Sequence, residues 1–358
     1  MICEYPPLFI IILSLSFLTI SIIFDIQSNK KLSALIALVM ILSYSILFGL
    51  RDYSIGSDTS SYVDNFLYSN WNFEYLFSLI TTIIQTLTNE PQIYLVIMTV
   101  IYGITIYLYT AIYGKKINTS IIIFTWCIIF SPSVLLGTIN YLRQPLAFTL
   151  FFIGFSLYTT TRKITIAPFL IMFLSIFVHS STSILVLFSL LVKHIKIKYM
   201  VILLILSIFI FLSGLMNTII DSHGDNYIIQ RTIARHIYFN PRRSITTIYL
   251  NIILYLFHYV ILLFLFYSDR DNHEAGITLK LYSFILSLSI FLSFNRELSL
   301  RYYYLLQFII PISYMCFTQT SKYRKLIKPF LILYCLSYLC YLLTRPWFID
   351  QLSGNIIP

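Results

Sequence analysis

Charge is scarce in this sequence. Asp, Glu, Lys and Arg make up 11% of its 358 residues while 58% are hydrophobic, whereas soluble domains carry about 25% charged residues. Apolar runs long enough to cross a hydrocarbon core of about 30 Å recur along the chain, and they lack the alternation of barrel strands. The sequence therefore predicts an all-α, polytopic integral membrane protein with about 12 transmembrane helices.

No soluble appendage and no internal repeat interrupts this pattern, so we expect a single transmembrane domain over residues 1–358. The first run lacks a basic leader and a small-residue cleavage site, which favours a span over a signal peptide. The segment 73–90 is short and is expected to be an interfacial or re-entrant helix, and residues 218–246 are expected to form an external loop. Spans are expected at 7–24, 32–50, 92–113, 119–137, 145–160, 164–178, 181–192, 199–217, 247–267, 281–295, 302–317 and 329–343.

Patterns typical of metal and cofactor sites are also missing. The five cysteines are scattered without a C-x-x-C pair, so neither a disulfide framework nor a metal site is expected. There is no glycine-rich phosphate loop, no G-x-S-x-G elbow and no H-E-x-x-H, which argues against an ATPase or a metalloprotease and predicts no cofactor. No carboxylate pair stands out for Mg²⁺, although Asp52 and Asp58 stay open. We attribute the net charge of +10 to topology and contact with membrane lipid, not to nucleic acid.

Lysine is confined to six loops. Cytoplasmic loops of membrane proteins are enriched in positive charge. If the six loops are cytoplasmic, two crossings separate each successive pair, provided that 73–90 does not cross, and both termini are external. The twelve lysines are Lys30, Lys31, Lys115, Lys116, Lys163, Lys193, Lys196, Lys198, Lys280, Lys322, Lys325 and Lys328.

Nine arginines fall on the opposite side of this expected topology. Positive charge there opposes the orientation rule, so topology does not explain it. The guanidinium fork fits phosphate and carboxylate groups bidentately, which predicts an outer face that holds an anion. Contact with lipid headgroups is the alternative, strongest for Arg242 and Arg243. The nine are Arg51, Arg143, Arg231, Arg235, Arg242, Arg243, Arg296, Arg301 and Arg345.

The first cluster of interest is LRDYSIGSDTSSYVDNF, residues 50–66. It gathers Arg51, Asp52, Asp58 and Tyr62 beside the bilayer, where charge is costly and usually functional. We expect the Asp58 side chain to cap the helix that follows. An ordinary capped turn is the alternative reading. Glu74 follows at the start of the short segment 73–90.

The second cluster is INYLRQPLAFTLFF, residues 139–152. Pro145 suits the first turn of a helix, which places Arg143 and Gln144 at its entrance. Free N–H groups and the helix dipole favour anions there. Asn140 shares a face with both residues if the turn is helical. The stretch predicts a phosphate-sized anion site at the outer interface, with a headgroup anchor as the alternative.

A histidine follows a short apolar segment in FVHSSTS, residues 177–183. Histidine is the side chain best suited to proton transfer near neutral pH, so His179 is a candidate, and a structural role is the alternative. In FNRELSLRYYY, residues 294–304, Arg296 and Arg301 bracket a short outer loop. The tyrosines after them suit the interface belt or a sugar ring.

The external loop 218–246 carries a helical pattern. Isoleucines recur every four residues from 229 to 237, and Arg231 and Arg235 repeat on another face. This is typical of an amphipathic helix lying in the membrane interface. It predicts either a lid over a lipid-linked substrate or a surface helix.

These motifs together resemble the EpsG-like branch of the Wzy-type bacterial polysaccharide polymerases. The resemblance rests on LRDYSIGSDTSSYVDNF, Glu74, NYLRQPLAF and HSS in this order, over about residues 48–185. It implies a glycosyltransferase of GT-C-like architecture in the bacterial inner membrane, with its active site on the periplasmic face. The implied substrate is an undecaprenyl-diphosphate-linked oligosaccharide, polymerised into O-antigen or exopolysaccharide without nucleotide sugar or ATP. A chain-length regulator is a possible protein partner.

Breaking a glycosyl-phosphate bond leaves negative charge on the diphosphate, and fixed guanidinium groups stabilise such charge. We assign this role to Arg51, Arg143, Arg296 and Arg301, Arg143 first. The acceptor hydroxyl needs a base, for which Asp58 and His179 are candidates and Glu74 the next. Sugar or phosphate oxygens would be held by Tyr62, Asn140, Gln144, Arg231 and Arg235.

Three rival functions stay open. An O-antigen ligase uses the same lipid donor, but ligases usually carry a larger periplasmic loop than 218–246. A lipid-linked oligosaccharide flippase needs cations reachable from both faces. A membrane O-acyltransferase needs its histidine on the cytoplasmic side, opposite to the side expected for His179.

Overall fold

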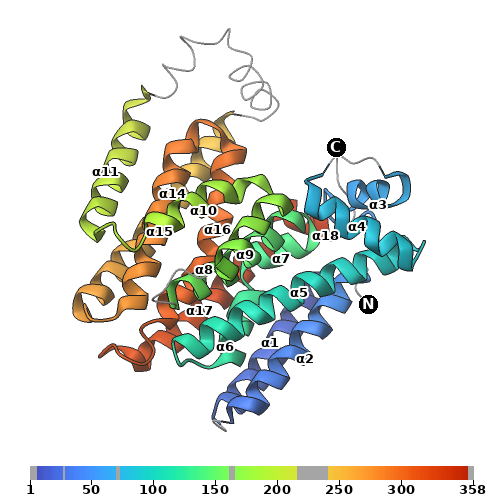
Figure 1. The fold of residues 1–358 in the computed structure, drawn as a ribbon, viewed down its shortest axis with the longest axis horizontal. Coiled ribbons are helices and arrows are strands. Elements are labelled where there is room, and N and C mark those ends of the chain that lie inside the picture. The colour runs from blue at the N-terminus through green and yellow to red at the C-terminus, as the bar shows by residue number, and fades with distance from the viewer. Residues whose placement is uncertain (1–5, 27–28, 70–72, 161–165, 216–240, 354–358) are drawn as a thin grey trace. The chain divides into compact units, whose positions relative to one another are not determined.

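The fold is known from a computed structural model that describes residues 6–26, 29–69, 73–160, 166–215 and 241–353 (Figure 1). The part described is helical throughout and contains no strand, which agrees with the all-α prediction. The chain divides into two compact units, Met1–Leu190 with Lys325–Pro358, and Leu191–Arg324. Each is described by itself.

The first unit contains the larger set of helices. They are α1 (Pro6–Ile26), α2 (Lys30–Gly49), α3 (Thr59–Tyr68), α4 (Tyr75–Leu87), α5 (Pro91–Lys116), α6 (Ile121–Ile129), α7 (Pro132–Ile139), α8 (Arg143–Thr160), α9 (Ile166–Val178), the 3₁₀ turn η1 (Ser180–Thr182), α10 (Ser183–Leu191), α17 (Arg324–Leu343) and α18 (Pro346–Ser353). The second unit contains α11 (Ile197–Ser213), α14 (Pro241–Ser268), α15 (His273–Phe291), the 3₁₀ turn η2 (Leu292–Phe294) and α16 (Arg296–Met315).

Six helices of the described chain are long and apolar enough to cross a membrane, or seven if α6 and α7 form one bent span. All six overlap spans expected from the sequence, so a multi-pass membrane protein is shown. The sequence predicts about twelve transmembrane helices, but only these six or seven helices of the described chain are long and apolar enough to qualify. One reason is length, since α9 has 13 residues and extends only about 20 Å at 1.5 Å per residue. The six spans are Pro7–Asp25, Lys30–Gly49, Pro91–Lys116, Ile248–Ser268, His273–Phe294 and Arg324–Leu343.

The expected continuous span at 119–137 is wrong. It consists of two helices, α6 and α7, bent by 59° relative to each other. Pro132 begins α7, and a proline without an N–H group suits the first position of a new helix better than the interior of an old one. The Ser131 hydroxyl donates to the carbonyl of Ile128 at 2.7 Å and helps to end α6.

The segment expected at 73–90 forms the 13-residue helix α4. At about 20 Å it is too short to cross the hydrocarbon core by itself, as expected for an interfacial or re-entrant helix. The predicted amphipathic helix of the loop 218–246, with Arg231 and Arg235, lies outside the described residues. The helical backbone of α14 already begins at Pro241, before the span expected at 247–267.

Helices α2 and α5 pack side by side (Figure 1). At Gly103 a Cβ atom would lie 2.0 Å from the Ser45 hydroxyl and 2.9 Å from a methyl of Ile41. Only glycine allows the two backbones to come this close, as is common between membrane helices. The Gln92 side chain donates to the carbonyl of Gly49 at 2.8 Å, so α5 starts where α2 ends.

Lysine side chains gather at one end of the first unit. Lys30 donates to Asn118 at 2.8 Å, and Lys328 forms an ion pair with Asp25 at 2.9 Å. The loops after α1, after α5 and before α17 therefore meet at the end opposite Arg51. Three of the six lysine-bearing loops therefore lie together, and the common membrane face expected for all six stays a prediction.

In the second unit, too, the lysine-bearing loops lie at one end. The Lys280 side chain donates to the carbonyl of Val192 at 3.1 Å, and Asn272 donates to the carbonyl of Cys316 at 2.9 Å. These contacts bring the lysine-bearing loops of this unit together at one end as well. Arg296, at the start of α16, lies a full helix length away from Cys316.

Candidate functional site

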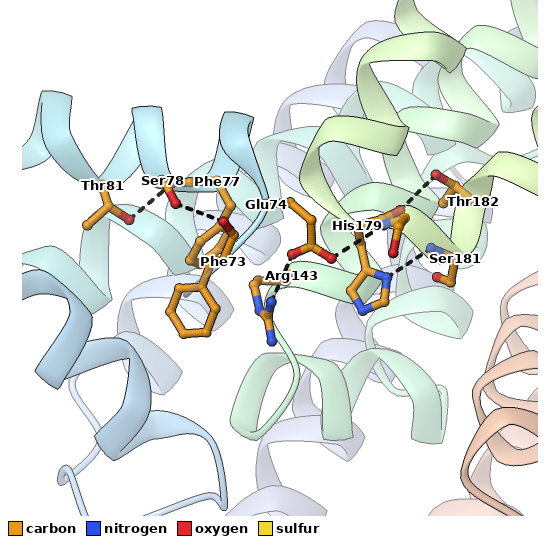
Figure 2. Close-up of polar contacts among 10 residues, drawn as sticks. Phe73, Glu74, Phe77, Ser78, Thr81, Arg143, His179, Ser181 and Thr182 are labelled. Atoms are coloured by element: carbon orange, nitrogen blue, oxygen red, sulfur yellow. Dashed lines mark hydrogen bonds and ion pairs between the residues drawn. The ribbon is translucent and has the colours of Figure 1, made fainter. Parts of the chain in front are cut away.

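Three polar side chains from distant segments meet in the first unit (Figure 2). They lie at the end opposite the lysines, because Arg143 begins α8 and Lys116 bonds the Ser156 carbonyl near the end of the same helix. Arg143 is the first residue of α8, Glu74 directly precedes α4, and His179 lies between α9 and η1. The Nη1 atom of Arg143 lies 2.8 Å from Oε2 of Glu74. The other carboxylate oxygen of Glu74 accepts a hydrogen bond from the Ser180 backbone, at 3.4 Å.

The charge on Glu74 is stabilised by its neighbours. Burial by itself raises the pKa of this carboxyl, but electrostatic attraction from His179 and Arg143 and backbone hydrogen bonds outweigh it, so the pKa of Glu74 lies below its ordinary value. Its side chain is 24% exposed and that of Arg143 is 23% exposed. Both charges therefore remain within reach of a ligand.

An aromatic ring supports the Arg143 guanidinium. Its central carbon lies 4.1 Å from the centre of the Phe73 ring, a cation–π geometry. Phe73 in turn packs on the buried ring of Tyr62, with 5.5 Å between centroids. Burial and the charge of Asp58 raise the pKa of the Tyr62 hydroxyl, although Arg143 acts to lower it. Tyr62 thus lies at the site as a neutral phenol.

His179 is almost fully buried, with 8% of its surface exposed. Its backbone is extended, and its Nδ1 atom accepts a hydrogen bond from the Ser181 backbone N–H at 3.2 Å. The ring therefore serves as the side-chain cap of the short turn η1. The same turn presents the Ser180 N–H group to Glu74.

Arg51 lies deeper than expected for a residue that contacts a ligand. It is 3% exposed, and it donates to Thr59 Oγ1 at 3.2 Å and to the Phe48 carbonyl at 3.0 Å. Its Nη2 atom has no hydrogen-bond partner within the described part of the chain. Burial lowers the pKa of Arg51 to about 10, so the group is still protonated near neutral pH.

The cap expected at Asp58 is not formed. Asp58 occupies the N-cap position of α3, but its side chain makes no capping hydrogen bond. The backbone there is helical, with φ −102° and ψ −3°, whereas capping side chains need an extended backbone. The carboxylate instead accepts a hydrogen bond from the Ser57 hydroxyl at 3.2 Å.

Asn140 and Gln144 lie behind Arg143. The Asn140 amide accepts from the Ser57 backbone at 3.0 Å and donates to Gln351 of α18 at 2.6 Å. The expected common face of Asn140 and Arg143 is wrong, because Asn140 ends α7 while Arg143 begins α8. Pro145 does lie in the first turn of α8, as predicted, and Gln144 is buried.

The loop before α3 reaches this turn through glycine. Gly56 has φ +87°, and a Cβ atom there would lie 2.2 Å from the carbonyl of Ile139, so only glycine fits. Its N–H group donates to the backbone carbonyl of Gln351 at 3.2 Å. The loop 50–59, the turn before α8 and the helix α18 are thereby joined.

The remaining predicted residues belong to other parts of the chain. Arg296 and Arg301 lie in the first two turns of α16, in the second unit, where Asn295 caps the helix through the Leu298 N–H at 3.2 Å. Arg231 and Arg235 are outside the described residues. Within the described ranges, no three His, Cys, Asp or Glu side chains come together in a way that could hold a metal ion.

A family model described as the EpsG family matches residues 34–357. The match covers nearly the whole chain, including every residue of the cluster around Arg143. The chain belongs to the EpsG family. No curated protein and no solved structure matches it. EpsG-family proteins resemble Wzy-type polymerases, so this is a polysaccharide-polymerase-like membrane protein with glycosyltransferase-like activity in general.

In this EpsG-family protein, sequence reasoning missed three contributors to the site. Phe73 supports the Arg143 guanidinium, the backbone of η1 binds Glu74 and His179, and Gln351 holds Asn140. Phe73 directly precedes Glu74 and was open to prediction as a neighbour. Gln351 lies 211 residues from Asn140, and no local pattern connects the two.

Proposed function

We propose that this protein polymerises undecaprenyl-diphosphate-linked oligosaccharide repeat units into O-antigen or exopolysaccharide. The reaction takes place on the periplasmic face of the bacterial inner membrane. The fold is a GT-C-like glycosyltransferase with about 12 crossings, including short helices that do not span. A chain-length regulator is a further partner.

The observation that carries the proposal is the meeting of Arg143, Glu74 and His179 at the end of the first unit opposite its lysines. Positive loops favour the cytoplasmic side, so this cluster faces the periplasm. ATP is not available there, whereas a lipid-linked diphosphate is. A partly exposed guanidinium at a helix N-terminus suits that anion.

The chemistry requires one bond to break and one to form. The bond between the anomeric carbon and the diphosphate oxygen breaks, and the diphosphate leaves with the electron pair. The acceptor sugar oxygen bonds to the anomeric carbon, and its proton passes to a base. Arg143 stabilises the charge that develops on the leaving group, after the diphosphate takes the place of Glu74 beside it.

The other predicted residues have supporting roles in this proposal. Asp58, Glu74 and His179 are the candidates to orient or deprotonate the acceptor hydroxyl. Tyr62, Asn140 and Gln144 are buried close to Arg143 and support its position. Arg51, which is buried, contributes positive electrostatic potential. The substrate is contacted by arginines of the second unit and of the external loop, namely Arg296, Arg301, Arg231 and Arg235.

The proposal is tested in a deletion strain complemented with wild type, Arg143→Ala or Lys31→Ala, with surface polysaccharide resolved by size on a gel. Lys31→Ala is the matched control, because it removes one exposed positive charge at the lysine end. We expect wild type and Lys31→Ala to restore a full ladder and Arg143→Ala to leave single repeat units. Membrane levels of each tagged variant are compared on a blot.

Two outcomes contradict the proposal. A ladder that is unchanged by the deletion excludes a polymerase. Loss of all surface sugar, single units included, points to a ligase or a flippase, because a lost polymerase leaves single-unit caps in place.

A further inference from the structure

We propose that His179 serves this site as a hydrogen-bond donor through Nε2–H and does not act as its general base. This assignment rests on the proposed function and deepens it. It follows from the hydrogen bond that the Ser181 backbone N–H donates to the ring nitrogen Nδ1.

The hydrogen bond to Nδ1 fixes where the ring proton lies. The Ser181 backbone N–H is 3.2 Å from Nδ1, and a backbone N–H group can only donate. Nδ1 must therefore present its lone pair. A neutral imidazole carries one proton, so that proton is on Nε2 and the ring has no lone pair left for a second hydrogen.

Local contacts hold the ring in this orientation. The backbone N–H of His179 donates to Ser175 at 3.0 Å, and its carbonyl accepts from the Thr182 N–H at 3.2 Å and from the Thr182 hydroxyl at 3.0 Å. The Ser175 hydroxyl also donates to the Thr182 hydroxyl at 3.0 Å. The turn that carries the Ser181 N–H is thus fixed before any substrate binds.

The ring and the guanidinium flank the same carboxylate. Figure 2 shows Arg143 and His179 on either side of Glu74, with the free end of the guanidinium and the lower edge of the imidazole extending to the same side. Arg143 can only donate hydrogen bonds. With Nε2–H as a second donor, the two side chains form a site for one anion, such as an oxygen of a leaving diphosphate.

The proton of the acceptor hydroxyl then goes to a carboxylate. Glu74 is the carboxylate of this cluster, and it accepts hydrogen bonds from Arg143 and from Ser180. In the transfer step the diphosphate leaves with the electron pair of the broken C–O bond, and Glu74 takes the proton from the acceptor oxygen. His179 neither gains nor loses a proton in this step.

Three substitutions separate a donor from a base. The side chain of Gln places an amide NH₂ near the position of Nε2. The shorter side chain of Asn places its amide oxygen near Nδ1, but its NH₂ does not reach the position of Nε2, and Ala has neither group. None of the three side chains is a base. We expect polymer output to fall about 100-fold for His179→Ala and His179→Asn, the usual cost of one lost donor to developing charge. His179→Gln should recover at least about tenfold of this loss. The output is measured in the deletion strain, per amount of tagged protein in the membrane.

Nitrogen NMR on the ¹⁵N-histidine-labelled protein measures the tautomer itself. The sequence has six histidines, and the signal of His179 is the one missing from the His179→Gln spectrum. We expect an unprotonated Nδ1 and a protonated Nε2. A protonated Nδ1 overturns the assignment, as does a His179→Gln variant with normal membrane levels and the output of His179→Ala. If wild type fails to restore polymer, the proposed function fails, and the NMR result still tests the tautomer.

Discussion

At the scale of single residues, Arg143 combines three interactions that depend on the shape of its side chain. Its guanidinium pairs with Glu74 through Nη1, lies on the Phe73 ring and leaves other N–H groups for a ligand. A lysine has the same charge but offers a compact ammonium group in place of a planar fork. The site therefore requires arginine, not merely a cation.

We expect Arg143→Lys to lower polymer output by about 10-fold or more, because the bidentate contact with the diphosphate is lost. The measurement is the polysaccharide ladder in the complemented deletion strain, with membrane levels as the control. Full output from Arg143→Lys would show that charge alone suffices and that the bidentate role is wrong.

Glu74 gives a pH dependence of stability at the same scale. Its pKa in the folded protein lies below the ordinary value of 4.5, so its contribution to the free energy of unfolding is fully present above about pH 4.5. The contribution is lost as the pH falls through the folded-state pKa.

Glu74→Gln removes this contribution. We expect the Tm difference between wild type and Glu74→Gln in detergent to be constant above about pH 5.5 and to shrink as the pH falls below 4.5. Arg143 also loses its partner in the variant, which makes the difference larger at neutral pH. A Tm difference that grows on acidification would contradict the lowered pKa.

At the scale of helices and loops, the turn before α8 is held by contacts that are distant in the sequence. Asn140 bonds the loop 50–59 through Ser57 and the helix α18 through Gln351. The orientation of Arg143, three residues further on, depends on this turn. Helix α18 is thereby part of the support of the site, although it carries none of the charged residues predicted for it.

A double substitution tests this contact. In Gln351→Glu, the new carboxylate still accepts the hydrogen bond from the Asn140 NH₂ group. In Asn140→Asp, the new carboxylate still accepts from the Ser57 backbone N–H, and the Gln351 amide can rotate so that its NH₂ group donates to it. We expect Gln351→Glu to lie close to wild type in Tm and Asn140→Asp to lower it, because Asn140 is fully buried and a carboxylate there loses its hydration. The double variant places two carboxylates face to face, which disfavours charge on both, and should lose about 1–3 kcal/mol beyond the sum of the single effects at pH 7.

Acidification distinguishes this repulsion from general damage. Near pH 5 the two carboxylates can share a proton, so the double variant should recover part of its Tm relative to wild type. Single effects that simply add, at both pH values, would show that the two side chains do not interact.

At the scale of the whole molecule, lysine and arginine lie at opposite ends of the first unit. Contacts of Lys30 and Lys328 define one end, and Arg51 and the Arg143 cluster lie at the other. Orientation in the membrane follows from positive charge in cytoplasmic loops. The end with the arginines is therefore expected outside.

Cysteine labelling tests this orientation. In a variant with its five cysteines replaced, we introduce Asn89→Cys in the exposed loop between α4 and α5, or Lys115→Cys at the exposed end of α5. We expect a membrane-impermeant maleimide to label position 89 in intact spheroplasts and position 115 only after permeabilisation. The reverse pattern would invert the topology, and labelling of both would contradict the separation of the two ends.

The sequence by itself determined the class of fold and the family. Low charge and long apolar runs are sufficient for a helical membrane protein, because backbone polar groups in lipid must be paired within a helix. Six of the expected spans overlap the long apolar helices, and the motifs around Arg51, Glu74, Arg143 and His179 resemble the EpsG family, whose model matches residues 34–357. Local patterns of this kind need no knowledge of which helices touch.

Only the tertiary structure decided how the site is built. Arg143 and Glu74 are 69 residues apart and Asn140 and Gln351 are 211 apart, and a one-dimensional pattern does not encode which turns meet. The break at Pro132, the burial of Arg51 and the uncapped carboxylate of Asp58 likewise depend on packing against other helices. The role proposed for His179 also depends on the fold, because the turn after α9 places the Ser181 N–H where it donates to Nδ1 of the ring.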